Sequence, residues 1–166
     1  AVDDKGQPCV GRATQFLSYA WKYSWKVVFT ALELFEQRQA EAGAEPSYFF
    51  INQFCLDQHE MSSTAHDATD ENYTDIVAKL QKSIEAPGKL LLLVDSWRDP
   101  APLARCWCLF EIYTAIQCGA DIVMCLSRSE ENSFTGELGS NQLELALLLQ
   151  AIDAEEAEAT VESDKA

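Results

Sequence analysis

The run of residues 89–94 constrains the fold of this chain more than any other segment. It reads K-L-L-L-L-V, so five consecutive residues are apolar. A short, continuous apolar run is typical of a parallel strand buried on both faces, whereas a half-exposed strand alternates apolar and polar residues. Helices must then cover both faces of the sheet. The run therefore predicts a layered α/β domain.

Strand-like and helix-like segments alternate on either side of this run. We expect strands at residues 14–19, 47–52, 90–94 and 121–126. Helices are expected at residues 23–39, 73–86 and 140–152, with a further helix that carries Glu111 and ends at Gly119. The alternation predicts a doubly wound parallel sheet with strand order 2-1-3-4, flanked by helices. A fifth strand is expected only if the chain beyond Ser127 supplies one.

One domain is expected at residues 14–152, between an N-terminal extension (1–13) and an acidic C-terminal tail (153–166). Two loops are predicted inside it. Residues 127–139 lead from the last strand to the last helix, and residues 53–72 form a long polar loop. The long loop has few apolar residues to offset its ordering entropy, so we expect it to be the most mobile part of the domain.

The charge of the chain restricts its partners. A formal net charge of −15 disfavours nucleic acid and anionic membranes, because both need a basic protein face. No segment reaches the length of a membrane span and no signal peptide opens the chain, so we expect no membrane insertion and a cytoplasmic location. The six cysteines match no metal-ligand spacing, and reduced structural thiols without a metal are expected.

Glu111 is the most informative polar residue. It lies in an otherwise apolar helical run, one turn after Trp107 and on the same face. A glutamate in such a run is rare unless it is paired or functional. Beside an indole and near the end of a sheet, a carboxylate can serve as an acid, a base or a cation-stabilising group. The alternative is a glutamate on the exposed stripe of an otherwise buried helix.

The carboxyl ends of the predicted strands supply candidate binding residues, because ligands of open parallel sheets bind beyond these ends. The chain has no glycine-rich phosphate loop and no nucleophile elbow. A nucleotide would therefore be held by aromatic stacking, cations and a carboxylate. The candidate binding residues are Tyr19, Trp21, Lys22, Asn52, Phe54, Ser96, Trp97, Arg98 and Trp107. Trp25, by contrast, is expected to pack in the core or to serve as amphipathic cover for it.

Four segments form an ordered set of motifs. Residues 16–19 read F-L-S-Y, and residues 48–52 read Y-F-F-I-N. Residues 83–85 read S-I-E ahead of the strand at 89–94, and residues 107–111 read W-C-L-F-E. In order and spacing these segments resemble the Toll/interleukin-1 receptor (TIR) domain family, and the last resembles the W-x-x-x-E motif of its NAD-cleaving members. The resemblance covers residues 14–127 and implies a flavodoxin-like, TIR-type sheet of four to five strands.

The resemblance also implies a function, an NAD⁺ glycohydrolase with a signalling role. Such an enzyme cleaves the nicotinamide–ribose bond and releases ADP-ribose or its cyclic form. Glu111 would stabilise the positive charge that develops on the ribose and orient its hydroxyls. Trp107, Trp21 or Trp97 would stack on a ring of the substrate, and Lys22 or Arg98 would neutralise the pyrophosphate. NAD⁺ is then a substrate rather than a cofactor, and homotypic TIR–TIR association is expected.

Two other functions stay open. A non-catalytic TIR-like interaction module would assemble through its helices and the loop at 53–72. Two features favour this alternative: the length of that loop, and Trp21 and Lys22 at a position after the first strand where TIR domains often have an arginine. The intact Trp107/Glu111 pair favours the enzyme. A receiver-like regulatory domain would need an acidic cluster at the ends of the first and third strands, and only Asp95 fits.

Overall fold

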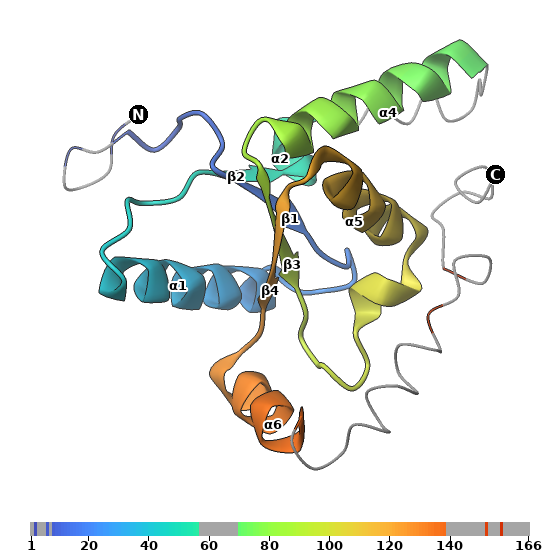
Figure 1. Cartoon of the computed structure of the whole chain (residues 1–166). Helices are drawn as coiled ribbons and strands as arrows, with labels where there is room; N and C mark the ends of the chain where they lie inside the picture. Colours follow the sequence, from blue (N-terminus) through green and yellow to red (C-terminus); the bar gives the residue numbers. More distant parts are fainter. Residues whose placement is uncertain are drawn as a thin grey trace.

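Four parallel strands form the centre of the fold (Figure 1). The computed structural model describes residues 2, 6, 8–56, 70–138, 152 and 157, with the backbone alone at 70–73 and 138. The strands are β1 (Gln15–Ser18), β2 (Phe49–Ile51), β3 (Lys89–Leu93) and β4 (Asp121–Cys125). They pair in the order β2-β1-β3-β4, which confirms the predicted parallel sheet and its strand order. The described residues contain no fifth strand.

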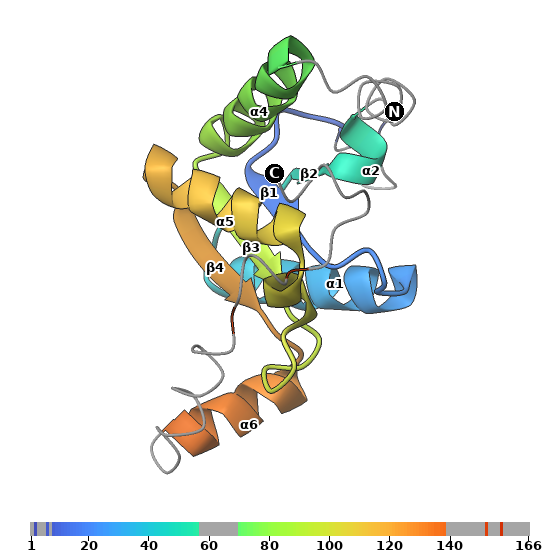
Figure 2. The ribbon, with the colours of Figure 1, turned by 90° about the vertical axis from the view of Figure 1, so that its right-hand side faces the viewer.

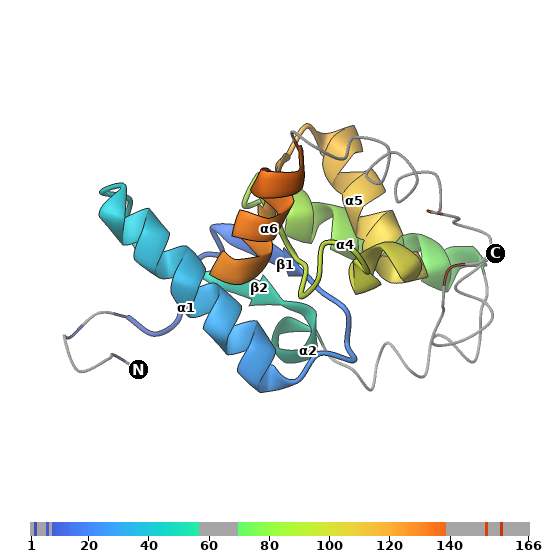
Figure 3. The same ribbon diagram turned by 90° about the horizontal axis from the view of Figure 1, so that it is seen from below.

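Helices lie on both faces of this sheet. They are α1 (Trp25–Glu41), α2 (Asn52–Cys55), α4 (Asp70–Glu85), α5 (Cys106–Cys118) and α6 (Arg128–Leu138), with a short 3-10 turn η1 (Ala101–Ala104) before α5. Helix α1 covers one face, and α4 and α5 cover the other (Figure 1). The view from below shows α1 and α5 on opposite sides of the strands (Figure 3).

Alternate residues of β3 enter two different hydrophobic clusters. Leu91 and Leu93 belong to the cluster packed on α1, and Leu90 and Leu92 belong to the cluster packed on α4 and α5. All four are buried. Full burial of a leucine contributes about 1.5–3 kcal/mol, so β3 stabilises the sheet from both sides. This confirms the two-face burial that the apolar run predicts.

Local signals fix where two of the helices begin or end. The side chain of Ser24 caps α1 by accepting a hydrogen bond from the Val27 N–H (3.4 Å). Gly119 ends α5 in the left-handed conformation (φ 69°), which a residue with a Cβ adopts only with strain. Because Gly119 stops the helix at that point, the chain turns at once into β4.

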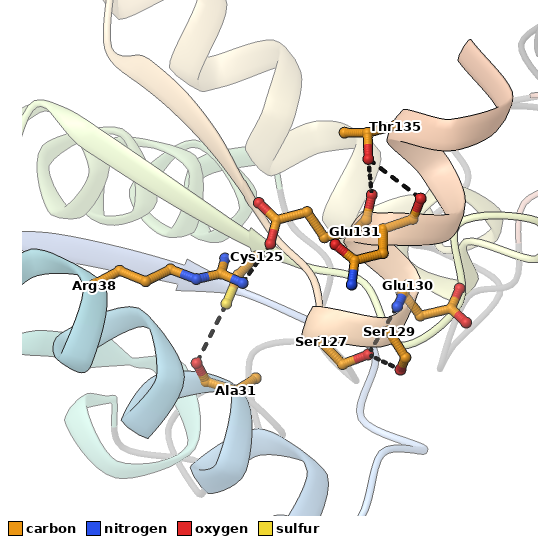
Figure 4. Close-up of polar contacts among 9 residues, drawn as sticks. Ala31, Arg38, Cys125, Ser127, Ser129, Glu130, Glu131 and Thr135 are labelled. Carbon is orange, nitrogen blue, oxygen red and sulfur yellow. Dashed lines mark hydrogen bonds and ion pairs between the residues drawn. The ribbon is translucent and has the colours of Figure 1, made fainter. Parts of the chain in front are cut away.

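The segment predicted as a loop at residues 127–139 is helix α6, so this prediction was wrong. Ser127 begins the helix by accepting a hydrogen bond from the Glu130 N–H (3.3 Å), and Glu130 and Glu131 suit the positive end of the helix dipole (Figure 4). Phe134 packs edge-on against Trp97, with ring centroids 5.6 Å apart. This single aromatic contact is too sparse to give a helical periodicity in the sequence.

Helix α6 lies at the carboxyl end of β4, at the opposite end of the domain from α4 (Figures 1 and 2). Arg38 of α1 forms an ion pair with Glu131 of α6 (Figure 4). The Cys125 thiol at the end of β4 donates to the Ala31 carbonyl (3.5 Å), so β4 and α6 are both joined to α1.

The predicted loop at residues 53–72 is shorter than expected at both ends. Helix α2 occupies residues 52–55 directly after β2, and α4 begins at Asp70. A single helical turn is too short for periodicity to detect. Residues 57–69 lie outside the described residues, and so does the mobility expected of them. Three other predicted segments lie mostly outside the described residues. They are the N-terminal extension before residue 8, the helix at 140–152, of which only Ile152 is described, and the acidic tail at 153–166, of which only Ala157 is described.

Candidate functional site

Three segments that are distant in the sequence meet at the carboxylate of Glu111. Ser18 is the last residue of β1, Asn52 directly follows β2, and Glu111 lies in the second turn of α5. The Ser18 hydroxyl donates to Oε2 of Glu111 (2.5 Å), and the Asn52 side-chain amide donates to Oε1 (2.8 Å). Both oxygens of the carboxylate are therefore bound by neutral donors at the carboxyl ends of adjacent strands.

Glu111 is buried, with 4% of its surface exposed. Burial raises the pKa of Glu111 from 4.5 to about 7, while the hydrogen bonds from Ser18 and Asn52 and the positive charge of Arg105 act in the opposite direction. At neutral pH the protonated and ionised forms are then both populated. A carboxyl group with such a pKa can donate or accept a proton, or stabilise a cation, near physiological pH.

The sequence of α5 explains why this glutamate faces the sheet. Its buried residues are Cys108, Glu111, Thr114 and Ala115, which follow the helical spacing of a single face. Glu111 therefore lies on the buried side of α5, and the alternative of an exposed stripe is wrong. Trp107, one turn earlier, is half-buried and packs edge-on against Phe110, with ring centroids 6.0 Å apart.

Tyr19 and Cys108 border the carboxylate. The Tyr19 side chain is buried, and its hydroxyl has no hydrogen-bond partner among the described residues. Burial, and then the nearby charge of Glu111, raise the pKa of Tyr19 to about 12. Cys108 donates from its thiol to the Tyr19 carbonyl (3.5 Å), and burial raises its pKa to about 12. Cys108 is thus a neutral thiol, unsuited to act as a nucleophile.

An aromatic stack lies on the surface at the same end of the fold. Trp25 packs face to face against Phe54 of α2, with ring centroids 4.9 Å apart, and against Phe29 at 5.5 Å. The Tyr19 ring is tilted against Trp25, with ring centroids 6.1 Å apart. Trp25, Phe29 and Phe54 are all exposed. Of the two structural roles expected of Trp25, the core position is wrong, and its stacking on exposed aromatic rings fits amphipathic cover.

The candidate binding residues separate into groups. Tyr19, Asn52 and Phe54 lie around Glu111 or on the adjoining aromatic stack, and Trp107 lies one turn before it. Trp21 and Lys22 are exposed in the turn after β1.

Trp97 and Arg98, in contrast, are engaged with α6. The indole N–H of Trp97 donates to the Ser133 hydroxyl (3.2 Å), and Arg98 lies over the Trp97 ring and pairs with Glu137. Ser96 is half-buried in the same turn.

Sequence reasoning missed Ser18 as a site residue. Its position at the end of β1 placed it at the binding edge, and strand alternation placed it on the face of Phe16, which α4 and α5 cover. The available signal was therefore a small polar residue on the inner face of a buried strand, facing the helix that carries the glutamate.

Two absences hold within the described residues. They contain no cluster of three or more His, Cys, Asp or Glu side chains that could hold a metal ion. None of the helices found among them combines the length and apolar character that crossing a membrane requires.

The chain was compared with protein-family models, curated proteins and solved structures. None of these three comparisons gives a match. The site must therefore be interpreted from its own geometry.

Proposed function

We propose that this chain cleaves NAD⁺ between nicotinamide and ribose, with Glu111 as the catalytic carboxylate and ADP-ribose or its cyclic form as the product. The observation that carries the proposal is a buried carboxylate at the carboxyl ends of β1 and β2 whose two oxygens are bound by neutral donors. Both hydrogen-bond donors are neutral, so the ionised carboxylate keeps a negative charge that can stabilise a cation developing beside it.

Departure of nicotinamide leaves positive charge on the ribose, and an ionised Glu111 would stabilise that charge. The ribose also carries two hydroxyl donors. These could replace or join Ser18 and Asn52 at the carboxylate, so that binding orients the sugar at the reacting carbon. Because burial raises the pKa of Glu111 to about 7, we expect the rate to rise with pH through this region as the carboxylate ionises.

The remaining parts of NAD⁺ need other contacts. The aromatic candidates are Tyr19, whose pKa is raised in part by the charge of Glu111, and Trp107, one turn before Glu111 on α5. The exposed Lys22 is a candidate cation for the pyrophosphate. Trp97 and Arg98 are weaker candidates than the sequence suggests, because α6 already engages both side chains. Under this proposal the protein resembles a TIR-type signalling enzyme that acts in the cytoplasm and associates with copies of itself.

A non-catalytic interaction module is the second candidate, and a specific surface favours it. Four large apolar side chains are exposed on α5 and the edge strand β4: Tyr113, Ile116, Ile122 and Met124. Ile122 and Met124 pair with Leu90 and Leu92 and so face the α5 side of the sheet. Neighbouring exposed apolar residues are typical of protein interaction surfaces.

The test is to incubate the purified protein with NAD⁺ at high protein concentration, or on a clustering scaffold, and to quantify nicotinamide. Glu111→Gln is nearly isosteric and should reduce turnover by about a hundredfold or more, the scale of one lost electrostatic contact in the transition state. Glu85→Gln is the matched control, because Glu85 is exposed at the end of α4, and it should leave turnover unchanged.

Equal turnover in wild type and Glu111→Gln would contradict the assignment of Glu111. Absence of nicotinamide release, even from clustered wild type, would favour the interaction module.

A further inference from the structure

Helix α2 is a single turn that connects the surface of the protein to the buried carboxylate. None of its four residues is buried. At its first position, the Asn52 amide reaches inward to Glu111 (2.8 Å). Two residues later, Phe54 points outward with 64% of its surface exposed. A helix of this length has little stability of its own, so contacts with other elements must determine where Asn52 lies.

The outward contact of α2 is made to a much more stable element. Phe54 stacks on Trp25, with ring centroids 4.9 Å apart and planes inclined by 17°. Trp25 is the first residue of the 17-residue helix α1, directly after the capping Ser24. Buried residues further along α1 fix that helix on the sheet. The stack therefore joins a weak element to a firmly packed one.

We propose that Trp25 and Phe54 are positioning residues for Glu111, because their stack fixes α2 and thereby keeps the Asn52 amide on the carboxylate. Neither ring needs to touch a substrate for this role. The proposal rests on the proposed function for its catalytic consequence, but its physical content concerns the free protein. If the stack is lost, α2 is less firmly held, and Oε1 of a buried carboxylate loses its donor for part of the time.

The consequence can be measured without NAD⁺. The hydrogen bond from Asn52 favours the ionised form of Glu111, so weakening it raises the pKa of that carboxyl above about 7. A ¹³C NMR titration of glutamate side-chain carboxyls gives this pKa directly, and Glu111→Gln identifies the signal. Trp25→Ala and Phe54→Ala should each raise the pKa by up to about one unit, the scale of one aromatic stack.

Matched controls separate the stack from a general effect of removing an exposed ring. Phe29→Ala removes the other stacking partner of Trp25, which lies on α1 itself and not on α2. Trp21→Ala removes a tryptophan that is 45% exposed in the preceding turn. Both variants should titrate like wild type. Trp25→Phe, which keeps an aromatic ring, should restore most of the wild-type value.

The dependence on Asn52 is tested by a double-variant cycle. Asn52→Ala should raise the pKa of Glu111 at least as far as Trp25→Ala does, because it removes the donor itself. Adding Trp25→Ala to Asn52→Ala should then change nothing further, since both substitutions act through one contact. If the protein cleaves NAD⁺, the ionisation seen in its pH–rate profile should move upward in the same variants.

Two results would overturn the inference. In the first, Asn52→Ala shifts the pKa of Glu111 but Trp25→Ala and Phe54→Ala leave it at the wild-type value. The stack would then not control the position of the Asn52 amide. In the second, Asn52→Ala leaves the pKa of Glu111 at the wild-type value. The Asn52 amide would then not act on the carboxyl group. Failure to cleave NAD⁺ would instead contradict the proposed function and leave the titration result standing.

Discussion

The ends of β1 and β2 differ from the end of β3 in how they accommodate polar groups, although all three lie at the same edge of the sheet. After β1 and β2, Ser18 and Asn52 enclose a buried carboxylate with neutral donors. After β3, Arg98 pairs with Glu137 of α6 at the surface. Charges that pair with each other need no ligand, whereas a buried carboxylate whose hydrogen-bond donors are neutral retains the capacity to stabilise an incoming cation. The comparison therefore locates the candidate chemistry on β1, β2 and α5.

The comparison also suggests that α6 is held by its aromatic contact more than by its charges. Exposed ion pairs contribute little because water solvates the separated charges well. Trp97, in contrast, is buried and packs on Phe134. Its backbone N–H also donates a hydrogen bond to the Glu130 carboxylate (3.0 Å).

The largest stability effect is expected at Trp97. Trp97→Ala removes a buried indole from the core and should lower the free energy of unfolding by about 3–5 kcal/mol, measured by urea denaturation. Trp21→Ala, which truncates an exposed tryptophan, is the control and should cost far less. A cost below about 1 kcal/mol for Trp97→Ala would show that the indole does not hold α6.

The second effect concerns the pH dependence of stability. The pKa of Glu111 is higher in the folded protein (about 7) than the ordinary value of 4.5, so the folded state binds the proton more tightly. Its contribution to stability is complete below the lower value and is lost as the pH rises through the higher one. The difference corresponds to about 3 kcal/mol.

Comparing wild type with Glu111→Gln isolates this contribution, since other groups titrate equally in both. Between about pH 4 and about pH 8, wild type should lose about 3 kcal/mol of unfolding free energy relative to the variant. Parallel pH profiles for the two proteins would mean that Glu111 is solvated rather than buried in solution.

The smallest effects are expected for the ion pairs of α6. Glu131→Gln and Glu137→Gln should each lower the free energy of unfolding by less than about 1 kcal/mol, because the paired side chains are partly exposed. Raising the salt concentration to about 1 M should reduce these differences further through screening. A cost comparable to that of Trp97→Ala would reverse the interpretation that α6 is held mainly by its aromatic contact.

The layered fold was predictable because its signals are local. The run at 89–94 and the alternation of segments depend on neighbouring residues, and they correctly predicted the parallel sheet and its order. The burial of Glu111 could not be predicted, because an apolar helix with a single glutamate does not reveal which side faces the sheet. In α1 the same ambiguity left both core packing and amphipathic cover open for Trp25, since Trp25 and Phe29 form a second apolar stripe beside the buried Val28 and Leu32.

The contacts of the site could not be predicted because they join distant segments. Ser18 and Asn52 meet Glu111 only through the register of the strands and the position of α5. The side chain at position 52 is an amide rather than a carboxylate. An amide donates to the buried carboxylate, whereas a second carboxylate there would repel it.

The three residues around the carboxylate are separated by long stretches of chain, 93 residues from Ser18 to Glu111 and 59 from Asn52 to Glu111. No fragment that lacks one of these segments can reproduce the site, and the site disappears whenever the domain unfolds. Any ligand that binds there binds only the native state, so its binding energy adds to the stability of the whole domain. A rise in melting temperature during a screen of nucleotides would therefore report occupancy of the site without any assay of turnover.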